Sequence, residues 1–368
     1  MARAFAVGVG NWWSHSKTVI LIWCICIFFY IFFFHMTLQN SSSSSSSDKY
    51  SEQRSRLYDK MERDLDERGA AFLKHGETSQ SLSLSDIFTL KDGSVTPVLK
   101  AANPPVRANV LYLSPEYSVP ISDNVKNTFS SYFDKVWFQN SSVYHSSMFH
   151  ASHHIEPVPA TEDEIEAEVN AVKAVADSLC PLKIVLDRVV LTSTGVLLGC
   201  WQPPKKQLVP MLLITMVIVI SKPLGMAPFL LLNSAEEILC WHGSCHHIQN
   251  GGSCPTYKMP RVISGTDPLA IRAKLKTALP HAPKKQLYDD AILHTSFARL
   301  LGHPKSPPME PLDELRFFHE LVAKLNDKIR GFEAVVSELW YVEEYDVLAL
   351  ALDGRMKVSR FKLGCSRT

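Results

Sequence analysis

Two segments in the C-terminal part of this 368-residue chain predict the same order of secondary-structure elements. Residues 106–202 and residues 262–368 each contain a predicted helix, a strand with a His-x-Ser motif, a second helix and further strands. A pattern that recurs at this level is far less expected by chance than a three-residue motif alone. We therefore predict an α+β fold of two lobes, each a copy of one α/β unit with an antiparallel sheet.

The first copy begins with a short apolar strand, and its later helix has a clear start signal. The predicted elements are a strand over 110–113, helices over 124–136 and from Thr161, and strands over 144–154, 184–190 and 195–201. Thr161 and Glu164 have the spacing of a capping box, in which each side chain bonds to a backbone N–H of the other residue. Apolar residues follow at helical spacing, so this helix should present one face to the core.

The second copy repeats this order with equally defined helix ends. The predicted elements are helices over 267–279 and 311–330 and strands over 291–300, 333–342, 346–352 and 355–363. Asp267 is a predicted N-cap followed by Pro268 in the first turn, and Gly331 closes the longer helix. The two copies therefore predict one architecture.

Each copy places a histidine and a serine two residues apart on a predicted strand. Because side chains alternate along a strand, His150 and Ser152 should face the same way, as should His294 and Ser296. If both pairs face one cleft, a neutral imidazole can take a proton from water while the other, as imidazolium, protonates the leaving oxygen. The two hydroxyls can donate hydrogen bonds to phosphate oxygens, so this chemistry requires neither a metal nor a cofactor. Arg299 either adds positive charge near the phosphate or is a surface residue at the strand end.

Paired His-x-Ser motifs on strands of a duplicated α/β unit resemble the 2H phosphoesterase superfamily. Within it, the sequence from 106 onwards, apart from an inserted segment described below, is most similar to the plant proteins described as RNA ligase/cyclic nucleotide phosphodiesterase family members. The resemblance implies a two-lobed fold and hydrolysis or transfer at cyclic (2′,3′-type) or 2′,5′-linked phosphodiesters. It implies catalytic roles for His150 and His294, substrate-binding roles for Ser152 and Ser296, and a small nucleotide or RNA-end cyclic phosphate as the ligand.

The residues themselves leave other interpretations open. His150 lies in a histidine-rich stretch, so His154 could be catalytic in its place, or the stretch could have no catalytic role. A zinc site made by His145, His153 and His154 is a further alternative, although its spacing differs from that of known zinc sites. His294, which has apolar neighbours on both sides, could be a core histidine.

The composition limits the partners that such a protein can bind. The 38 basic and 37 acidic residues give a formal net charge of +1, so we expect no binding of extended nucleic acid. A small phosphorylated ligand remains compatible, because one anionic group needs only a few donors. The leading hypothesis is a monomeric, metal-independent phosphodiesterase. The alternatives are a catalytically silent nucleotide-binding protein and a membrane-tethered adaptor whose repeat is structural.

The N-terminal part predicts a membrane anchor. After a tail over 1–17, residues 18–38 contain the apolar run from Val19 to Met36, which is long enough to span the hydrocarbon core as a helix. The run is longer than in a cleaved signal peptide, which is the alternative interpretation. Basic residues precede the run and a sequon begins at Asn140, so we predict a single-pass protein of the secretory pathway (ER or Golgi) with a lumenal C-terminal domain.

The region 39–105 is predicted to contain a stalk and a spacer. Ser41 to Ser47 form a polyserine run that cannot bury apolar surface and should stay flexible. The charged stretch 48–74 has apolar residues at helical spacing. It predicts either an amphipathic helix outside the core or a solvated spacer.

Residues 203–261 interrupt the repeat and differ in composition from both copies. Their removal would join Gln202 to Val262 at a natural strand end and turn. The apolar run 208–220 is short for a membrane span and suits a buried or interfacial segment. We interpret the whole segment as a poorly structured insertion, with translated intron sequence as one origin.

The eight cysteines of the chain form no compact framework. Cys240, Cys245 and Cys254 cluster in the insertion with nearby histidines, but their spacing matches no familiar metal site. We expect most cysteines to be buried thiols, with a disulfide as an open alternative if the domain is lumenal.

Overall fold

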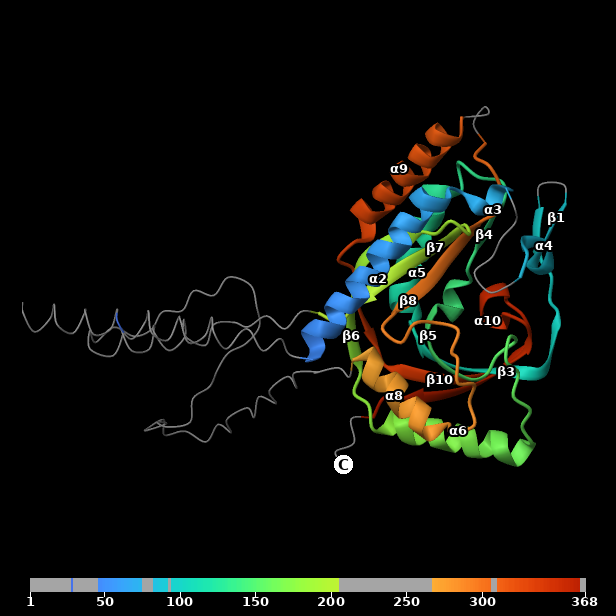
Figure 1. The fold of residues 1–368 in the computed structure, drawn as a ribbon, viewed down its shortest axis with the longest axis vertical. Helices are drawn as coiled ribbons and strands as arrows, with labels where there is room; N and C mark the ends of the chain where they lie inside the picture. The colour runs from blue at the N-terminus through green and yellow to red at the C-terminus, as the bar shows by residue number, and fades with distance from the viewer. Residues whose placement is uncertain are drawn as a thin grey trace, which may run out of the picture.

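The protein consists of helices packed against antiparallel sheets (Figure 1). The structure, a computed structural model, describes residues 28, 46–74, 82–91, 94–204, 267–305 and 310–364. Within these residues there are a four-stranded sheet, a five-stranded sheet and a separate two-stranded sheet, and all neighbouring strands are antiparallel. The predicted α+β class with antiparallel sheets is confirmed.

Each large sheet combines strands from both copies of the repeat. The four-stranded sheet has the order β11-β10-β3-β5 and consists of β3 (Ala101–Tyr112), β5 (His145–Ser152), β10 (Glu338–Asp346) and β11 (Met356–Lys362). The five-stranded sheet has the order β4-β8-β7-β6-β9 and consists of β4 (Val136–Phe138), β6 (Leu182–Leu191), β7 (Val196–Gln202), β8 (His294–Leu300) and β9 (Glu333–Val336). Residues 106–202 and 262–368 therefore do not form one lobe each, which corrects the predicted division.

The physical reason is an exchange of hairpins between the copies. β7, in the hairpin that ends the first copy, pairs with β8 of the second copy. β10, in the hairpin that ends the second copy, pairs with β3 of the first. Because of this exchange, one hydrophobic core contains residues of both copies, among them Phe129, Val172, Leu275 and Phe318. Neither copy can bury its apolar surface alone.

Four helices of the two copies cover the sheets. They are α5 (Pro115–Phe129), α6 (Glu162–Asp177), α8 (Pro268–Ala278) and α9 (Pro311–Ile329). α5 and α9 pack at the five-stranded sheet, and α6 and α8 pack at the four-stranded sheet (Figure 1). Two predicted caps are confirmed: Thr161 and Glu164 form a capping box, and the Asp267 carboxylate accepts the N–H of Leu269 at 2.9 Å.

The helix predicted over 124–136 lies earlier in the chain. It is α5, which begins at Pro115, a residue that suits the first helical position because its missing N–H would have no partner there. It ends at Phe129, and residues 136–138 form β4 instead.

A strand was expected over 346–352, but this segment contains the single-turn helix α10 (Ala349–Leu352). Leu348 and Asp353, at the two ends of α10, have φ values of 61° and 58°. This left-handed backbone interrupts an extended chain, so the segment turns instead of continuing as a strand.

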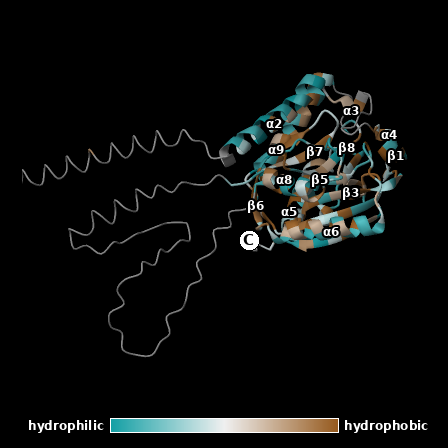
Figure 2. Ribbon diagram, turned by 60° about the horizontal axis from the view of Figure 1, so that its bottom comes forward, coloured by the Kyte–Doolittle hydropathy of each residue, from teal (hydrophilic) through white to brown (hydrophobic). Residues whose placement is uncertain are grey.

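The charged stretch 48–74 belongs to the folded body. It forms α2 (Ser46–Arg68), which lies on the five-stranded sheet, and α3 (Ala71–Lys74). Tyr58 and Leu65 are buried, while hydrophilic residues follow the outer side of α2 (Figure 2). Tyr58 covers an apolar sheet face made by Val190, Val196, Leu198 and Cys200. The predicted amphipathic helix is therefore confirmed, whereas its placement outside the core and the alternative of a solvated spacer are wrong.

The rest of the predicted spacer region also contains structure. Residues 84–91 and 94–97 form α4 (Leu84–Ile87) and the paired strands β1 (Phe88–Lys91) and β2 (Ser94–Pro97). Ile87 and Phe88 pack against Leu301 and Leu352. The folded body therefore includes described residues well before 106.

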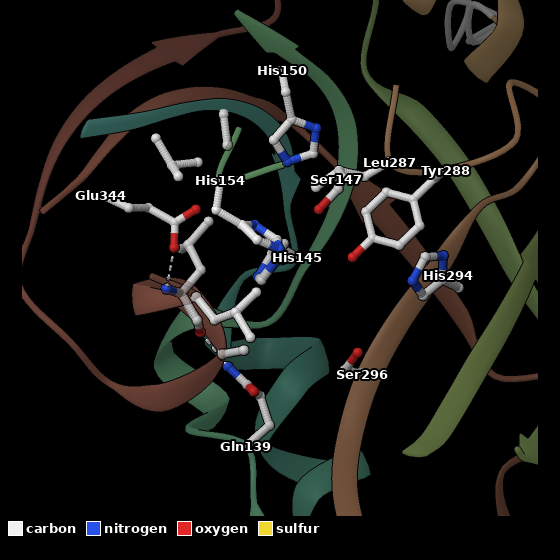
Figure 3. Close-up of a pocket in the computed structure, with 15 residues that line it drawn as sticks. Gln139, His145, Ser147, His150, His154, Leu287, Tyr288, His294, Ser296 and Glu344 are labelled. Atoms are coloured by element: carbon white, nitrogen blue, oxygen red, sulfur yellow. Dashed lines mark hydrogen bonds between the residues drawn. The ribbon is translucent and has the colours of Figure 1, made fainter. Parts of the chain in front are cut away.

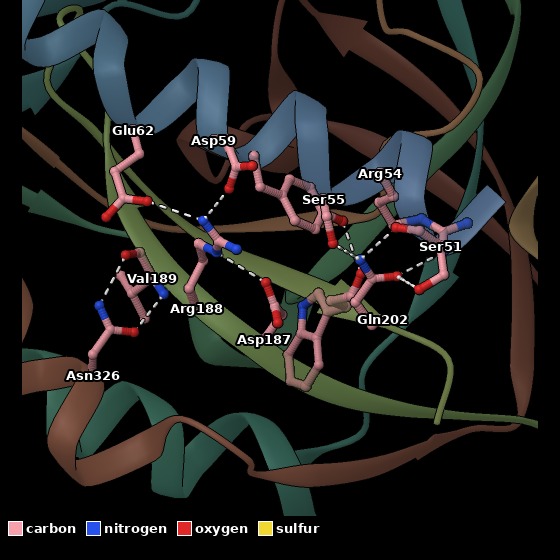
Figure 4. Close-up of polar contacts among 12 residues, drawn as sticks. Ser51, Arg54, Ser55, Asp59, Glu62, Asp187, Arg188, Val189, Gln202 and Asn326 are labelled. Carbon is pink, nitrogen blue, oxygen red and sulfur yellow. Dashed lines mark hydrogen bonds and ion pairs between the residues drawn. The ribbon is translucent and has the colours of Figure 1, made fainter. Parts of the chain in front are cut away.

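Arg54 on α2 joins segments that are far apart in the sequence (Figure 4). Its side chain is fully buried and donates to the carbonyl of Ala291 at 2.7 Å and to Oε1 of Gln202 at 2.9 Å. It also forms an ion pair with Asp267 at 3.3 Å. Gln202 and Asp267 flank residues 205–266, which lie outside the described residues. The interpretation of 203–261 as an insertion thus stays a prediction.

Other predictions also fall on residues that are not described. The span predicted over 18–38 is among them, apart from Phe28. In the described part of the chain, no helix has the length and apolar composition needed to cross a membrane. Cys180 is disulfide-bonded, whereas Cys200 is a free buried thiol.

Replacing Tyr58 with phenylalanine should destabilise the protein. The Tyr58 hydroxyl lies 2.8 Å from the carbonyl of Trp201 and 2.7 Å from that of Leu293, and it accepts the N–H of Leu293. Its loss leaves buried backbone groups unpaired, so urea titration should show a decrease of about 1–3 kcal/mol in the free energy of unfolding. Arg56→Ala, on the exposed side of α2, is the control and should change little. Identical curves for both variants would contradict the packing of α2.

A chain in which Gln202 is joined directly to Val262 should fold like the full chain. Because Arg54 binds both Gln202 and Asp267, residues 262–266 have only a short gap to bridge. We expect an unchanged circular dichroism spectrum and an equal or higher melting temperature. Loss of cooperative unfolding in the shortened chain would mean that 203–261 contributes to the core.

Candidate active site

His150 on β5 and His294 on β8 line one cavity between the two large sheets (Figure 3). Ser146 and Thr295, on the same two strands, are joined by a hydrogen bond of 3.2 Å between their hydroxyl groups. The cavity has a volume of about 60 Å³ and is partly open to solvent. This is room for a few water molecules, or for a group the size of a phosphate. The structure thus brings the two predicted histidines together.

β5 is irregular, and its irregularity decides which side chains reach the cavity. In its pairing with β3, the register shifts between Ser152 and His150 and again between Phe149 and Ser147. Each shift is a β-bulge, whose extra residue reverses the alternation of side chains beyond it. His145, Ser147 and His150 therefore all line the cavity.

The Ser152 side chain points away from the cavity and binds a backbone group. It is fully buried, it is not a lining residue, and its Oγ accepts the N–H of Val158 at 3.1 Å. The prediction that Ser152 faces the ligand beside His150 is corrected, because strict two-residue alternation fails at the bulge. Ser147 provides the cavity-facing hydroxyl of this strand.

The second motif has the predicted geometry. His294, Thr295 and Ser296 pair with β7 in regular register, so His294 and Ser296 share one face of β8. Both line the cavity. Thr295 is buried between them, and its Oγ1 accepts the indole N–H of Trp201 at 3.1 Å.

Tyr288 lies between the two histidines, in a connection for which the sequence has no periodic signal (Figure 3). Its ring centroid is 6.2 Å from that of His150 and 5.0 Å from that of His294. Gln286 fixes this connection to β5: its amide oxygen accepts the N–H of His150 at 2.7 Å, and its amide nitrogen donates to the His150 carbonyl at 3.1 Å. The Tyr288 ring and hydroxyl are thereby held at the cavity.

The neighbouring histidines divide into two groups. His145 and His154 line the cavity, whereas His153 does not. Nδ1 of His153 accepts the N–H of Glu156 at 3.1 Å, so its Nε2 carries the proton and donates to the Lys285 carbonyl at 2.9 Å. The zinc site considered for these three histidines is not assembled, since no group of three potential metal ligands occurs among the described residues.

Burial sets the charge of the two candidate catalytic histidines. It lowers the pKa of His150 to about 3, with further contributions from the charges of His153 and His154. It also lowers the pKa of His294 to about 3, with a further contribution from the positive charge of Arg272. Both imidazoles are therefore neutral at pH 7 in the ligand-free protein.

Arg272 on α8 fixes the cavity wall. Its guanidinium donates to the backbone carbonyls of Met148 at 2.9 Å, Ser147 at 3.0 Å and Asp290 at 2.6 Å. Burial lowers the pKa of Arg272 to about 10. These bonds join the bulged part of β5 to the connection that carries Tyr288.

Glu344 on β10 forms the wall across from Tyr288 and His294 (Figure 3). Its Oε2 accepts the N–H of Leu350 at 2.9 Å, in α10. Burial raises the pKa of Glu344 to about 7, although the N–H groups of Leu350 and Ala349 oppose the shift. This contact was not predicted from the sequence, because a strand was expected over 346–352 and only a helical turn directs both N–H groups at the carboxylate.

Arg299 does not line the cavity. Its side chain is partly buried, its Nη1 has no hydrogen-bond partner among the described residues, and burial lowers its pKa to about 10. Arg299 therefore fits neither of its two sequence interpretations, a surface residue or a cation at the phosphate site.

Comparison with known proteins finds remote structural similarity only. No known protein family and no curated protein matches the sequence. Among solved structures, the crystal structure of TT0787 of Thermus thermophilus is similar, with a TM-score of 0.35 and 11% sequence identity over 71% of this chain and 100% of that chain. A similarity at this level carries no conclusion about family or function.

The two buried histidines should make the fold sensitive to acid. Their pKa values in the folded protein are about 3, whereas the unfolded chain has values near 6.5, so below pH 6.5 the unfolded state binds more protons and stability decreases as the pH falls. Urea titrations at pH 7 and pH 5 measure how far the free energy of unfolding decreases between the two pH values. In a variant with His150→Gln and His294→Gln this decrease should be smaller than in the wild type, by up to about 2 kcal/mol per histidine. His281→Gln, at an exposed position, is the control. Equal losses in all three proteins would contradict the burial of the pair.

Proposed function

We propose that the protein is a metal-independent phosphodiesterase that hydrolyses a cyclic (2′,3′-type) or 2′,5′-linked nucleotide phosphodiester. The observation that carries this proposal is the position of His150 and His294 in one cavity of phosphate size. Ser147, Ser296 and Tyr288 bring hydroxyl groups to the same cavity. These are the parts that two-histidine chemistry of the 2H phosphoesterase kind requires.

The two imidazoles divide the proton transfers of hydrolysis. One neutral imidazole takes a proton from water while the water oxygen bonds to phosphorus. The other, as imidazolium, gives its proton to the ribose oxygen while the P–O bond to that oxygen breaks. The products are a phosphate monoester and a free ribose hydroxyl, and the two histidines have exchanged protonation states. The hydroxyls of Ser147, Ser296 and Tyr288 donate to the non-bridging oxygens as their charge increases.

Binding of the anionic substrate favours the protonated form of the histidine that acts as the acid. In the ligand-free protein burial disfavours the imidazolium form, as the pKa of about 3 for both histidines indicates. A phosphodiester anion within hydrogen-bond distance favours that form and raises the pKa. No lysine or arginine of the described chain lines the cavity, so a protonated histidine is the cation that meets the anion there.

A catalytically silent nucleotide-binding protein is the second candidate. The low pKa of both histidines favours it, because a histidine that stays neutral can bind a phosphate oxygen without protonating a leaving group. The two functions differ in turnover alone, so binding of a cyclic nucleotide without its hydrolysis would identify this second function.

We place the folded body in the lumen of the secretory pathway, with 18–38 as the membrane anchor. The disulfide bond at Cys180 supports an oxidising compartment. Asn140, which begins an Asn-Ser-Ser sequon, is exposed as a glycosylation site must be.

Substitution of either histidine should reduce hydrolysis of 2′,3′-cyclic nucleotides by roughly 10²–10⁴-fold, because each carries one proton transfer. The double variant should be little worse than the single ones, since the pair acts as a unit. Ser147→Ala and Ser296→Ala should have milder effects on kcat, because each removes one donor to the phosphate.

Ser152→Ala is the matched control, since Ser152 does not line the cavity, and its kcat should be unchanged. Initial rates on a panel of cyclic nucleotides, in EDTA, provide the measurement. A folded His294→Ala protein with full activity would rule out the two-histidine mechanism.

A further inference from the structure

The cavity wall contains a carboxyl group that the phosphodiester chemistry does not use. The Glu344 residue is 5% exposed and lines the cavity. Its Oε2 accepts the N–H of Leu350 at 2.9 Å. Figure 3 shows the second oxygen, Oε1, turned away from the bonded N–H of Leu350 and toward the cavity. A carboxylate oxygen that faces the cavity is an acceptor that a ligand there can meet with a donor.

The position of Glu344 separates it from the reacting phosphate. Glu344 lies on β10 and His150 on β5, with β3 between them. Neighbouring strands are about 4.8 Å apart, which puts the two backbones roughly 10 Å apart. A carboxylate would also repel a phosphate at contact distance. Glu344 is therefore placed to meet another part of the nucleotide.

The cavity is partly open to solvent, so the edge of a flat aromatic ring can enter it beside Glu344 while the rest of the ring lies outside the enclosed volume. Apolar surface comes from β3 and from the residues in and next to α10, namely Val106, Ala108, Leu348, Leu350 and Ala351. The imidazole rings of His145 and His154 lie between Glu344 and Ser147 (Figure 3). Apolar surface and flat imidazole rings beside a carboxylate acceptor suit the edge of a nucleobase better than a ribose, whose hydroxyls need several polar partners.

We propose that Glu344 selects nucleotides whose base carries the amino group of adenine or cytosine. Its Oε1 accepts a hydrogen bond from that amino group, whereas hypoxanthine and uracil present a carbonyl oxygen at the same place and are disfavoured. The inference rests on the proposed function for its substrate class. It adds a specificity residue and leaves the roles of His150 and His294 unchanged.

Glu344→Gln separates selection from the structural role of Glu344 in holding α10. A glutamine carbonyl can still accept the N–H of Leu350, which turns the amide N–H₂ toward the cavity. The variant therefore keeps the contact with α10 and presents a donor where the wild type presents an acceptor. Glu343→Gln is the matched control, because Glu343 is the next residue on β10, faces the other way and pairs with Lys357 at 3.0 Å.

The experiment measures kcat/KM of the full chain for four 2′,3′-cyclic nucleotides, those of cytidine, uridine, adenosine and inosine. It is run at pH 8, where Glu344 is ionised, because burial raises its pKa only to about 7. The wild type and Glu343→Gln should prefer cytidine to uridine and adenosine to inosine by about tenfold or more, as expected for a hydrogen bond to a charged group. Glu344→Gln should lose or reverse both preferences.

Equal kcat/KM within each pair for the wild type would overturn the inference, as would unchanged preferences in Glu344→Gln. If no nucleotide is hydrolysed, the proposed function fails, and calorimetric binding of the four nucleoside 3′-monophosphates tests selection separately. A tighter Kd for cytidine and adenosine monophosphates would then uphold the role of Glu344. Equal Kd values would overturn it.

Discussion

The hydrogen bond between Ser146 and Thr295 joins the two large sheets at the strands that carry the histidines. Both hydroxyls are buried and share a hydrogen bond of 3.2 Å, and Thr295 also accepts the indole N–H of Trp201 at 3.1 Å. His294 and Ser296 flank Thr295 and therefore face the cavity whenever this contact is made. The exchange of hairpins between the copies also keeps the two histidine-bearing strands together, because β5 and β8 then lie in different sheets that share one core.

Local signals in the sequence account for much of this arrangement. The cap residues Thr161 and Asp267 act within three residues of their helix starts, so sequence spacing identifies them. Alternation predicts the face of Ser296 because β8 pairs in regular register there. It fails for Ser152, since a β-bulge depends on how β5 pairs with β3, and no pattern within β5 reveals that pairing.

Residues that sequence reasoning does not find are defined by contacts between distant segments. Tyr288 reaches the cavity because Gln286 binds the backbone of His150. Glu344 becomes a cavity residue because the chain after it turns into α10. The composition of α2 is that of a hydrophilic spacer, yet Tyr58 covers a sheet face that would otherwise be exposed. In each case tertiary packing decides what local propensity leaves open.

Burial also links the charge of the site to its ligand. The environment that keeps His150 and His294 neutral makes the ligand-free fold less stable in acid, because the unfolded chain binds protons that the native state does not. The same environment strengthens the attraction between an imidazolium and a bound anion, because the local dielectric constant is low. The described cavity lining has no fixed cation, so an anion that enters it favours uptake of a proton from solvent. Anion binding and formation of the acid thus become one coupled step, and the charged acid is populated mainly when a phosphate is present to use it.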